Sequence, residues 1–422
     1  MRSRLALLLP TPTQRILAAA AAALFGALLS SPLSAQSWYR AAFQGPVNAA
    51  TFENQSPSGT LKVGPFIFDI SANLSFESSD NALLSSTPEA GSNIGFGLTF
   101  DASQQATKAQ QLKLSGELTQ RYVLSGPGRD LRYLTLAPGS ALRYTVYIDE
   151  VRVMPFINLS RQVDPIDAPT VNNTDVFEQA SYDGGLQLDW PLRQYVVQLL
   201  ALRGFKSSDS DQQEKIEIDR SLLSARLLRT FSASFELGID AFAVDQDYTN
   251  GPSRQSHIRT AGFFGRYTLT RTIRVKGAVG VNRVSYDEGS IATDQDRNTS
   301  LHAELEASHR VRANLNYTLR LARSVADGIS SNFYESTDLT LAPTFTASER
   351  LTLRGDVGWQ RVVESSAVGE TGNRKNYGLQ LEYTAKGKTT LRGGVRYLDK
   401  SSTLAPRSYT QLRFDLSLRK QF

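Results

Sequence analysis

The sequence predicts an all-β fold, a transmembrane antiparallel up-and-down β-barrel of about 18 strands. Three observations predict it. Apolar and polar residues alternate over segments of about a dozen residues, which is typical of strands that show lipid on one side only. Tight turns alternate with longer polar loops, and this hairpin unit recurs about every 39 residues in the second half of the chain. The chain also ends on an alternating segment, residues 408–422, whose last residue is Phe422.

The composition excludes several other classes of protein. Hydrophobic residues make up 41% of the 422 residues and the mean hydropathy is -0.28, so a bundle of transmembrane helices is not expected. Without cysteine, the chain forms no disulfide and no thiolate metal site. The net charge of +5 comes from interspersed basic and acidic residues, whereas a nucleic-acid binder clusters its basic residues. We therefore expect no nucleic acid and no cofactor.

Residues 1–35 have the features of a secretory signal peptide. Three arginines precede the apolar run of residues 16–29, and small residues follow as far as Ala35. This order predicts export and cleavage after Ala35. A membrane-anchor helix is the alternative, but the run is short for a span. Residues 36–64 combine Pro, Ser, Asn and Gly without periodicity, so we expect a flexible periplasmic segment that is too short for a folded plug.

Residues 65–422 are expected to form the barrel. An even number of strands puts both chain ends on the periplasmic side of an outer membrane. Sixteen strands is the alternative count, because the region before Ala180 is less regular and places Pro138 and Pro155 inside strands. The predicted strands are 66–77, 91–104, 110–123, 131–147, 151–162, 177–190, 194–206, 214–229, 232–246, 255–269, 273–286, 298–309, 312–325, 333–346, 350–364, 374–386, 389–399 and 408–422.

The tight turns distinguish this fold from a soluble β-sandwich, which is the alternative all-β architecture. A sandwich usually turns about every 8 to 12 residues and would not keep long and short connections in alternation. It would also need one uniform apolar side on every strand without any helix, which a closed cylinder in lipid explains more simply. The predicted tight turns lie at residues 191–193, 229–231, 270–272, 310–311, 348–350 and 386–388.

The signal peptide, the hairpin repeat and the terminal Phe422 together resemble the porin-like outer-membrane β-barrel proteins of Gram-negative bacteria. Residues 160–169 (SRQVDPIDAP) and 324–340 (SVADGISSNFYESTDLT) are similar to segments found in proteins of this kind. The resemblance implies an outer-membrane location, contact with outer-membrane lipid and lipopolysaccharide, and insertion by the barrel-assembly machinery, for which Phe422 is the assembly signal. It does not specify which solute passes, and both a monomer and a homo-oligomer are compatible with it.

The polar side of the predicted strands carries charge, and barrel closure would turn that side toward the lumen. Eighteen strands enclose a lumen wide enough for water, and charges there bias which ions and solutes pass. The alternative is that opposite charges pair into ladders that only stabilise the wall. The basic residues expected to line the pore are Arg274, Lys276, Arg312, Arg320, Arg354, Arg392, Arg396, Arg413 and Arg419, and the acidic ones are Glu236, Asp240, Glu304, Glu306, Asp356, Glu382 and Asp415.

The predicted function is that of an outer-membrane porin-like channel for passive diffusion of small hydrophilic solutes. The alternative is a structural or export-associated barrel that works with a periplasmic apparatus, such as one for exopolysaccharide secretion. An outer-membrane hydrolase is less favoured, because no histidine lies in a recognisable nucleophile motif. His302 shares a face with Glu304 and Glu306, which a polar lumen lining explains without catalysis or a metal. We therefore predict no catalytic site and no metal site.

Overall fold

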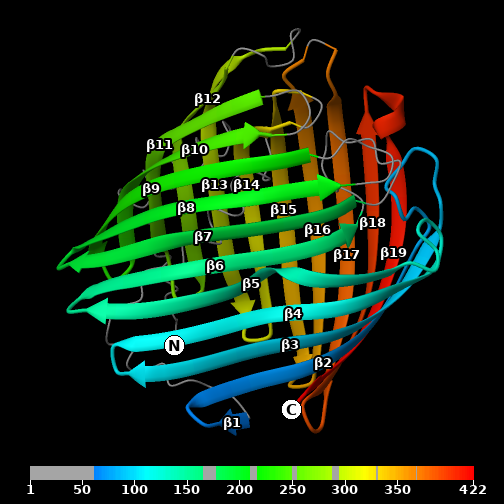
Figure 1. Ribbon diagram of the computed structural model, residues 1–422, viewed down its shortest axis with the longest axis horizontal. Coiled ribbons are helices and arrows are strands. Elements are labelled where there is room, and N and C mark those ends of the chain that lie inside the picture. Colours follow the sequence, from blue (N-terminus) through cyan, green and yellow to red (C-terminus); the bar gives the residue numbers. More distant parts are fainter. Residues whose placement is uncertain are drawn as a thin grey trace, which may run out of the picture.

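The computed structural model describes residues 61–164, 177–209, 216–249, 254–287, 294–328, 331–366 and 368–422. Within these ranges an 18-strand antiparallel β-sheet closes on itself into a barrel (Figure 1). Each strand pairs with its neighbours in sequence, and the last strand pairs with the first long strand from Arg413↔Ser79 to Gln421↔Ser71. The predicted up-and-down barrel of about 18 strands is therefore confirmed.

The strands coincide with the predicted ones to within a few residues. They are β1 (Leu61–Val63), β2 (Phe66–Ser79), β3 (Gly91–Thr107), β4 (Gln110–Ser125), β5 (Arg132–Ile148), β6 (Val151–Asp164), β7 (Phe177–Leu192), β8 (Tyr195–Asp209), β9 (Ile216–Ser232), β10 (Phe235–Tyr248), β11 (Arg254–Thr268), β12 (Ile273–Tyr286), β13 (Arg297–Arg312), β14 (Leu315–Asp327), β15 (Phe333–Ser348), β16 (Leu351–Glu364), β17 (Thr371–Ala385), β18 (Thr389–Ser402) and β19 (Tyr409–Gln421).

The short strand β1 is an addition to the predicted set. It pairs with the start of β2, and Gly64 at φ +58° makes the turn between them. Leu61–Val63 was expected to belong to the flexible segment, so regular pairing begins slightly earlier than predicted. The expected signal peptide and the rest of that segment lie outside the described residues.

Helix is scarce in the described part of the chain. It is limited there to one 3₁₀ turn, η1 (Ala405–Arg407), in the connection between β18 and β19. No helix among the described residues is long and apolar enough to cross a membrane.

Tight turns lie at one end of the barrel, which we call the turn end, and longer connections lie at the other, the loop end (Figure 1). Arg193 (φ 53°) and Gly387 (φ 73°) adopt the left-handed conformation in two of the tight turns. The chain also closes here, since the Phe422 N–H donates to the Ile70 carbonyl at 2.9 Å. Strand β2 thus begins, and β19 ends, at the turn end.

Two of the predicted tight turns were placed too early. Residues 229–231 and 310–311 belong to strands, because β9 continues to Ser232 and β13 to Arg312. In both hairpins a register shift beside the turn lets the ladder continue for two to three more residues. The shift at Arg310/Arg312 also changes the side on which the last residue of β13 lies.

The irregular region around β5 and β6 keeps two separate strands. The ladder between them skips from Leu136 to Ser140, and Gly139 in the skipped segment has φ +93°. Pro138 lies in this bulge, and Pro155 lies where the β5–β6 ladder has a second gap. Proline lacks the N–H that a ladder needs, so both prolines lie at gaps in this ladder. The count therefore stays at 18 strands rather than sixteen.

Alternate residues along each strand point to opposite sides of the barrel wall. On one side large apolar residues are widely exposed, with Leu223 at 63% and Phe263 at 59%. On the other side Leu200, Gln187 and Asn282 are almost fully buried, at 0% to 1%. The exposed apolar side is the outer face of the barrel, as the alternation predicts for strands in lipid. A cluster of buried apolar side chains lies on the inner side of β6 and β8–β12 and also includes Val325 of β14 and Phe333 of β15.

Within the described residues, the ladder between β13 and β14 ends early and leaves a seam in the wall. Their ladder stops at Ala303↔Arg323, although β13 stays paired with β12 and β14 with β15 beyond that level. On the loop-end side of this level, contacts between side chains and backbone connect β12–β13 with β14–β15. The Arg323 carbonyl lies 3.1 Å from His302 Nδ1, and the rings of Tyr286 and Phe333 stack with centroids 6.3 Å apart. Since His302 and Tyr286 are on the inner side, the loop end of β14–β15 lies inside that of β12–β13.

Candidate functional site in the lumen

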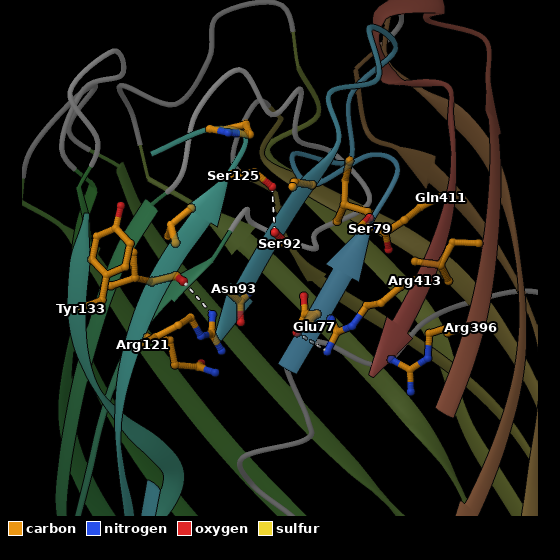
Figure 2. Close-up of a pocket in the computed structure, with 18 of the residues that line it drawn as sticks. Glu77, Ser79, Ser92, Asn93, Arg121, Ser125, Tyr133, Arg396, Gln411 and Arg413 are labelled. Carbon is orange, nitrogen blue, oxygen red and sulfur yellow. Dashed lines mark hydrogen bonds and ion pairs between the residues drawn. The ribbon is translucent and has the colours of Figure 1, made fainter. Parts of the chain in front are cut away.

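A cavity of about 400 Å³ opens inside the barrel near the loop end (Figure 2). Its lining combines residues of β2–β7 with residues of β18 and β19. Gln179 on β7 and Arg396 on β18 belong to strands far apart around the barrel, so they line one cavity only across the interior. The polar side of the strands therefore faces the lumen.

Three arginines line this cavity, and they differ in how their charge is compensated. Arg413 Nη2 lies 2.9 Å from Glu77 Oε2, and Arg121 donates to the Val163 carbonyl at 3.3 Å. Arg396 is exposed to the cavity and has no ion pair with any residue that the structure describes. Figure 2 shows its guanidinium pointing into the same space as those of Arg413 and Arg121. A bare positive charge therefore faces the lumen here.

The position of Arg396 is unfavourable for the wall itself. It lies directly opposite Arg413 in the ladder between β18 and β19. Like charges at directly opposite positions of an antiparallel pair destabilise the sheet, whereas opposite charges stabilise it. Stability of the wall therefore does not explain why both positions carry arginine. We call the inner face of β18, β19 and β2–β4 around these three residues the arginine wall.

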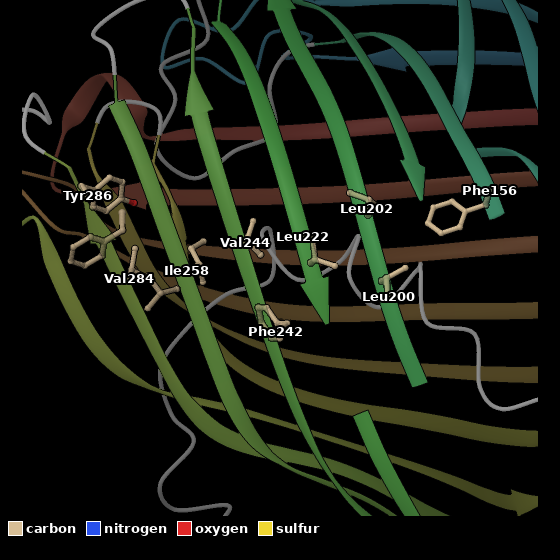
Figure 3. Close-up of a cluster of buried hydrophobic side chains, with 11 residues drawn as sticks. Phe156, Leu200, Leu202, Leu222, Phe242, Val244, Ile258, Val284 and Tyr286 are labelled. Atoms are coloured by element: carbon tan, nitrogen blue, oxygen red, sulfur yellow. The ribbon is translucent and has the colours of Figure 1, made fainter. Parts of the chain in front are cut away.

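The inner face of β6–β12 is different, and we call it the apolar wall (Figure 3). One residue from each strand lies in a single in-register row across it. All of the side chains in the row other than Gly185 are 8% exposed or less. The row consists of Phe156, Gly185, Leu202, Leu222, Val244, Ile258 and Val284.

Several charges on the apolar wall form ion pairs within it. Arg152 forms an ion pair with Asp189, and their side chains are only 6% and 3% exposed. Gln187 and Gln198 also donate to Asp189, at 3.1 and 3.0 Å. Asp240, one of the predicted acidic pore residues, lies 3.4 Å from Arg226 and forms an ion pair with it. Much of the charge on this wall is thus compensated within it, and the exposed Arg274 on the inner side of β12 is an exception.

Most of the other predicted pore-lining residues occupy cross-strand ion pairs. Each pair joins neighbouring strands, so its charges compensate each other within the wall. The pairs are Arg266–Glu236 (2.6 Å), Lys276–Glu306 (2.9 Å), Arg320–Glu304 (3.0 Å), Arg354–Glu382 (3.4 Å) and Arg392–Glu382 (2.8 Å). Glu382 thus forms ion pairs with two arginines at once.

The remaining predicted residues have individual positions. Arg274 lies opposite Ser308, and Asp415 lies opposite Glu77. Arg419 donates to Ser71 Oγ at 2.9 Å, and Asp356 accepts from Asn376 at 2.5 Å.

Arg312 differs from the expectation. After the bulge at the end of β13 it pairs with Leu315, whose neighbours on that side are apolar, so it does not share the charged row of Glu304 and Glu306. A bulge of one residue reverses the side of everything beyond it.

No protein-family model matches the sequence, and no curated protein matches it. Among solved structures, Acinetobacter baumannii OccAB2 is similar at 13% identity with a TM-score of 0.50, over 85% of this chain and 98% of that one. Pseudomonas aeruginosa OccK5 (OpdH) has 13% identity and a TM-score of 0.49, over 86% and 100% of the two chains. Pseudomonas aeruginosa OpdK, solved with vanillate, has 11% and 0.49, over 84% and 99%.

The chain has the fold of the outer-membrane porin-like β-barrels. This fold and the apolar outer face indicate an outer-membrane location, because a closed barrel leaves no unpaired strand edge in lipid. At such low identity the similarity concerns the fold alone, so the properties of the lumen follow from this chain's own residues.

A buried ion cluster fixes the loop end of the porin-like barrel. Arg407 of η1 lies 3.0 Å from Glu364 Oε2 and 3.1 Å from Glu370 Oε2. Lys400 lies 2.9 Å from Glu370 Oε1, and the Lys400 and Glu370 side chains are 2% and 0% exposed. The cluster ties the β18–β19 connection to the β16–β17 connection, beside the arginine wall. This cluster could not be predicted from the sequence because its four residues come from β16, β18 and two different connections, which meet only in the folded barrel.

The histidine that shares a face with two glutamates has another role in this porin-like barrel. His302 contacts the Arg323 carbonyl at the seam, while Glu304 and Glu306 pair with Arg320 and Lys276. In the described part of the chain no group of three His, Cys, Asp or Glu residues is arranged to hold a metal ion.

Proposed function

We propose that this chain is an outer-membrane channel for passive diffusion of small hydrophilic solutes, and that the arginine wall sets its preference among them. The observation that carries the proposal is Arg396, an exposed lumen cation opposite Arg413 that the wall does not need. Cations that line a pore favour the passage of anions. The loop end faces the cell exterior and both chain ends face the periplasm, since short turns are periplasmic in barrels of this kind.

The two walls together produce a sideways field in the channel. A hydrated solute meets fixed positive charge at Arg396 and Arg413, whereas on the opposite side ion pairs such as Arg152–Asp189 compensate much of the charge. Negative groups of the solute turn toward the arginines, which provide charge-assisted hydrogen bonds. Glu77 compensates part of the charge of Arg413, so binding there stays weak enough for release. Weak binding that still attracts the solute is what conduction requires.

The experiment that tests the proposal is single-channel recording of the refolded protein in a planar bilayer. We expect stable conductance steps, and liposomes that carry the protein should swell in small hydrophilic solutes. A folded barrel, recognised by its heat-dependent migration in gels, that never conducts would overturn the proposal. Co-purification of that silent barrel with periplasmic proteins would then favour the export-associated function.

A further inference from the structure

The outer face of β8–β11 is hollowed within its apolar band. A hollow of about 580 Å³ is floored by three alanines of neighbouring strands, Ala225, Ala241 and Ala261, which lie in one register row. The next row toward the turn end carries large side chains, with Ile239 at 50% exposure and Phe263 at 59%. The row of small side chains between larger neighbours makes an apolar groove on the outer face.

A pair of arginines lies at the next level toward the loop end. Arg259 is two residues beyond Ala261 on β11 and so shares its outer side, about 7 Å further along the strand. Arg283 on β12 lies directly opposite Arg259 in the ladder. Arg283 is exposed and has no ion pair within the described residues. Two like charges thus stand side by side on the outside of the barrel, where a lipid-facing surface ends.

Arg259 keeps part of its guanidinium available. It donates to Asp245 Oδ1 at 2.7 Å and to the Val244 carbonyl at 3.0 Å, and its side chain is 48% exposed.

Acidic side chains and a histidine occupy the levels beyond the arginines. Asp245 also contacts His257 Nδ1 at 2.6 Å, and His257 Nε2 lies 3.5 Å from Asp287. Arg203 and Asp219 form a 2.8 Å pair there. From the band outward, the outer face therefore presents an apolar groove, then two adjacent arginines of which Arg283 has no ion pair within the described residues, then mixed charge.

We propose that this surface binds an anionic phosphorylated glycolipid of the outer leaflet, with one acyl chain in the alanine groove and a headgroup phosphate between Arg259 and Arg283. Guanidinium groups match phosphate oxygens in a bidentate manner, and their charge attracts the phosphate at the edge of the lipid. The mixed charges beyond contact the sugars and their bound ions. The inference rests on the orientation in the proposed function, with the loop end outside, but not on conduction.

The first test is native mass spectrometry of the refolded full-length protein with bisphosphorylated lipid A, and with phosphatidylethanolamine as the reference lipid. We expect the double variant Arg259→Gln/Arg283→Gln to bind lipid A about tenfold more weakly, because two charge-assisted hydrogen bonds are lost. Binding of phosphatidylethanolamine should not change. Arg361→Gln, which removes an exposed arginine from β16 on the opposite wall, is the matched control and should bind lipid A as the wild type does.

The second test fills the groove. Ala241→Phe should weaken lipid A binding, whereas Ala307→Phe, on the outer side of β13, should not. Wild-type lipid A binding by the double arginine variant would overturn the proposal, as would an Ala241→Phe variant that changes only the monomer–oligomer balance, since a second copy would then be the occupant. Conductance and heat-dependent migration are measured on the same variants. Normal conduction without lipid A preference would refute this inference alone, and a silent barrel that prefers lipid A would refute only the channel.

Discussion

The apolar wall and the arginine wall follow the same alternation of polar and apolar residues, yet they present opposite surfaces to the lumen. On β6–β10 the charges described above are paired across strands, as Arg152 is with Asp189. On β18 and β19 Arg396 stays bare beside a second arginine. The difference teaches that the charge of a lumen depends on which residues meet across strands, and not on how many charged residues point inward.

The largest expected effect breaks a buried pair of the apolar wall. Arg152→Ala leaves Asp189 buried without its partner, and we expect a loss of roughly 3 to 5 kcal/mol in the free energy of unfolding. Urea unfolding in detergent micelles measures it. The matched change on the more exposed pair, Arg354→Ala, should cost at most about 1 kcal/mol, because Glu382 keeps Arg392. Equal losses at the two sites would contradict the distinction between the walls.

The next effect concerns the apolar row. Leu222 is 4% exposed on the inner side and its neighbour Leu223 is 63% exposed on the outer side. Leu222→Ala should cost about 2 to 5 kcal/mol through lost packing and the cavity it leaves. Leu223→Ala should cost clearly less, since its side chain is surrounded by lipid rather than by packed protein. If the outer variant were the more damaging in the same unfolding assay, the assignment of the two faces would be wrong.

The smallest effect sharpens the description of the arginine wall. Arg396→Gln removes a like-charge contact with Arg413, so the barrel should become more stable by about 0.2 to 1 kcal/mol. Arg392→Gln on the same strand removes one of the two partners of Glu382 and should instead be neutral or slightly destabilising. A marked loss of stability in Arg396→Gln would show that this residue has a structural partner.

The strands and their sides could be predicted because alternation is a local property of the sequence. The segment that ends at Phe422 and the β12 segment show it clearly, and closure of the barrel then decides which side faces water. Even the two prolines near β5 and β6 did not hide the strands, since both lie at gaps in the ladder.

The partners of individual charges could not be predicted in the same way. They depend on register, and register in turn depends on bulges such as the one that turns Arg312 away from the charged row. The seam at His302 and the cluster around Glu370 involve connections whose course no local pattern encodes. The apolar row was missed for a related reason. Leu222 and Val244 look like isolated exceptions on polar faces until the register aligns them.

The most direct test of the central claim is the reversal potential of single channels under a salt gradient, compared between the wild type and Arg396→Glu. We expect the wild type to favour anions and the variant to shift toward cations, because an exposed charge of the arginine wall that lacks an ion pair has changed sign. Arg361→Glu makes the same change on the outer face of β16 and should leave the reversal potential where it was. An Arg396→Glu channel with the wild-type reversal potential would contradict the claim that this wall sets the passage of ions.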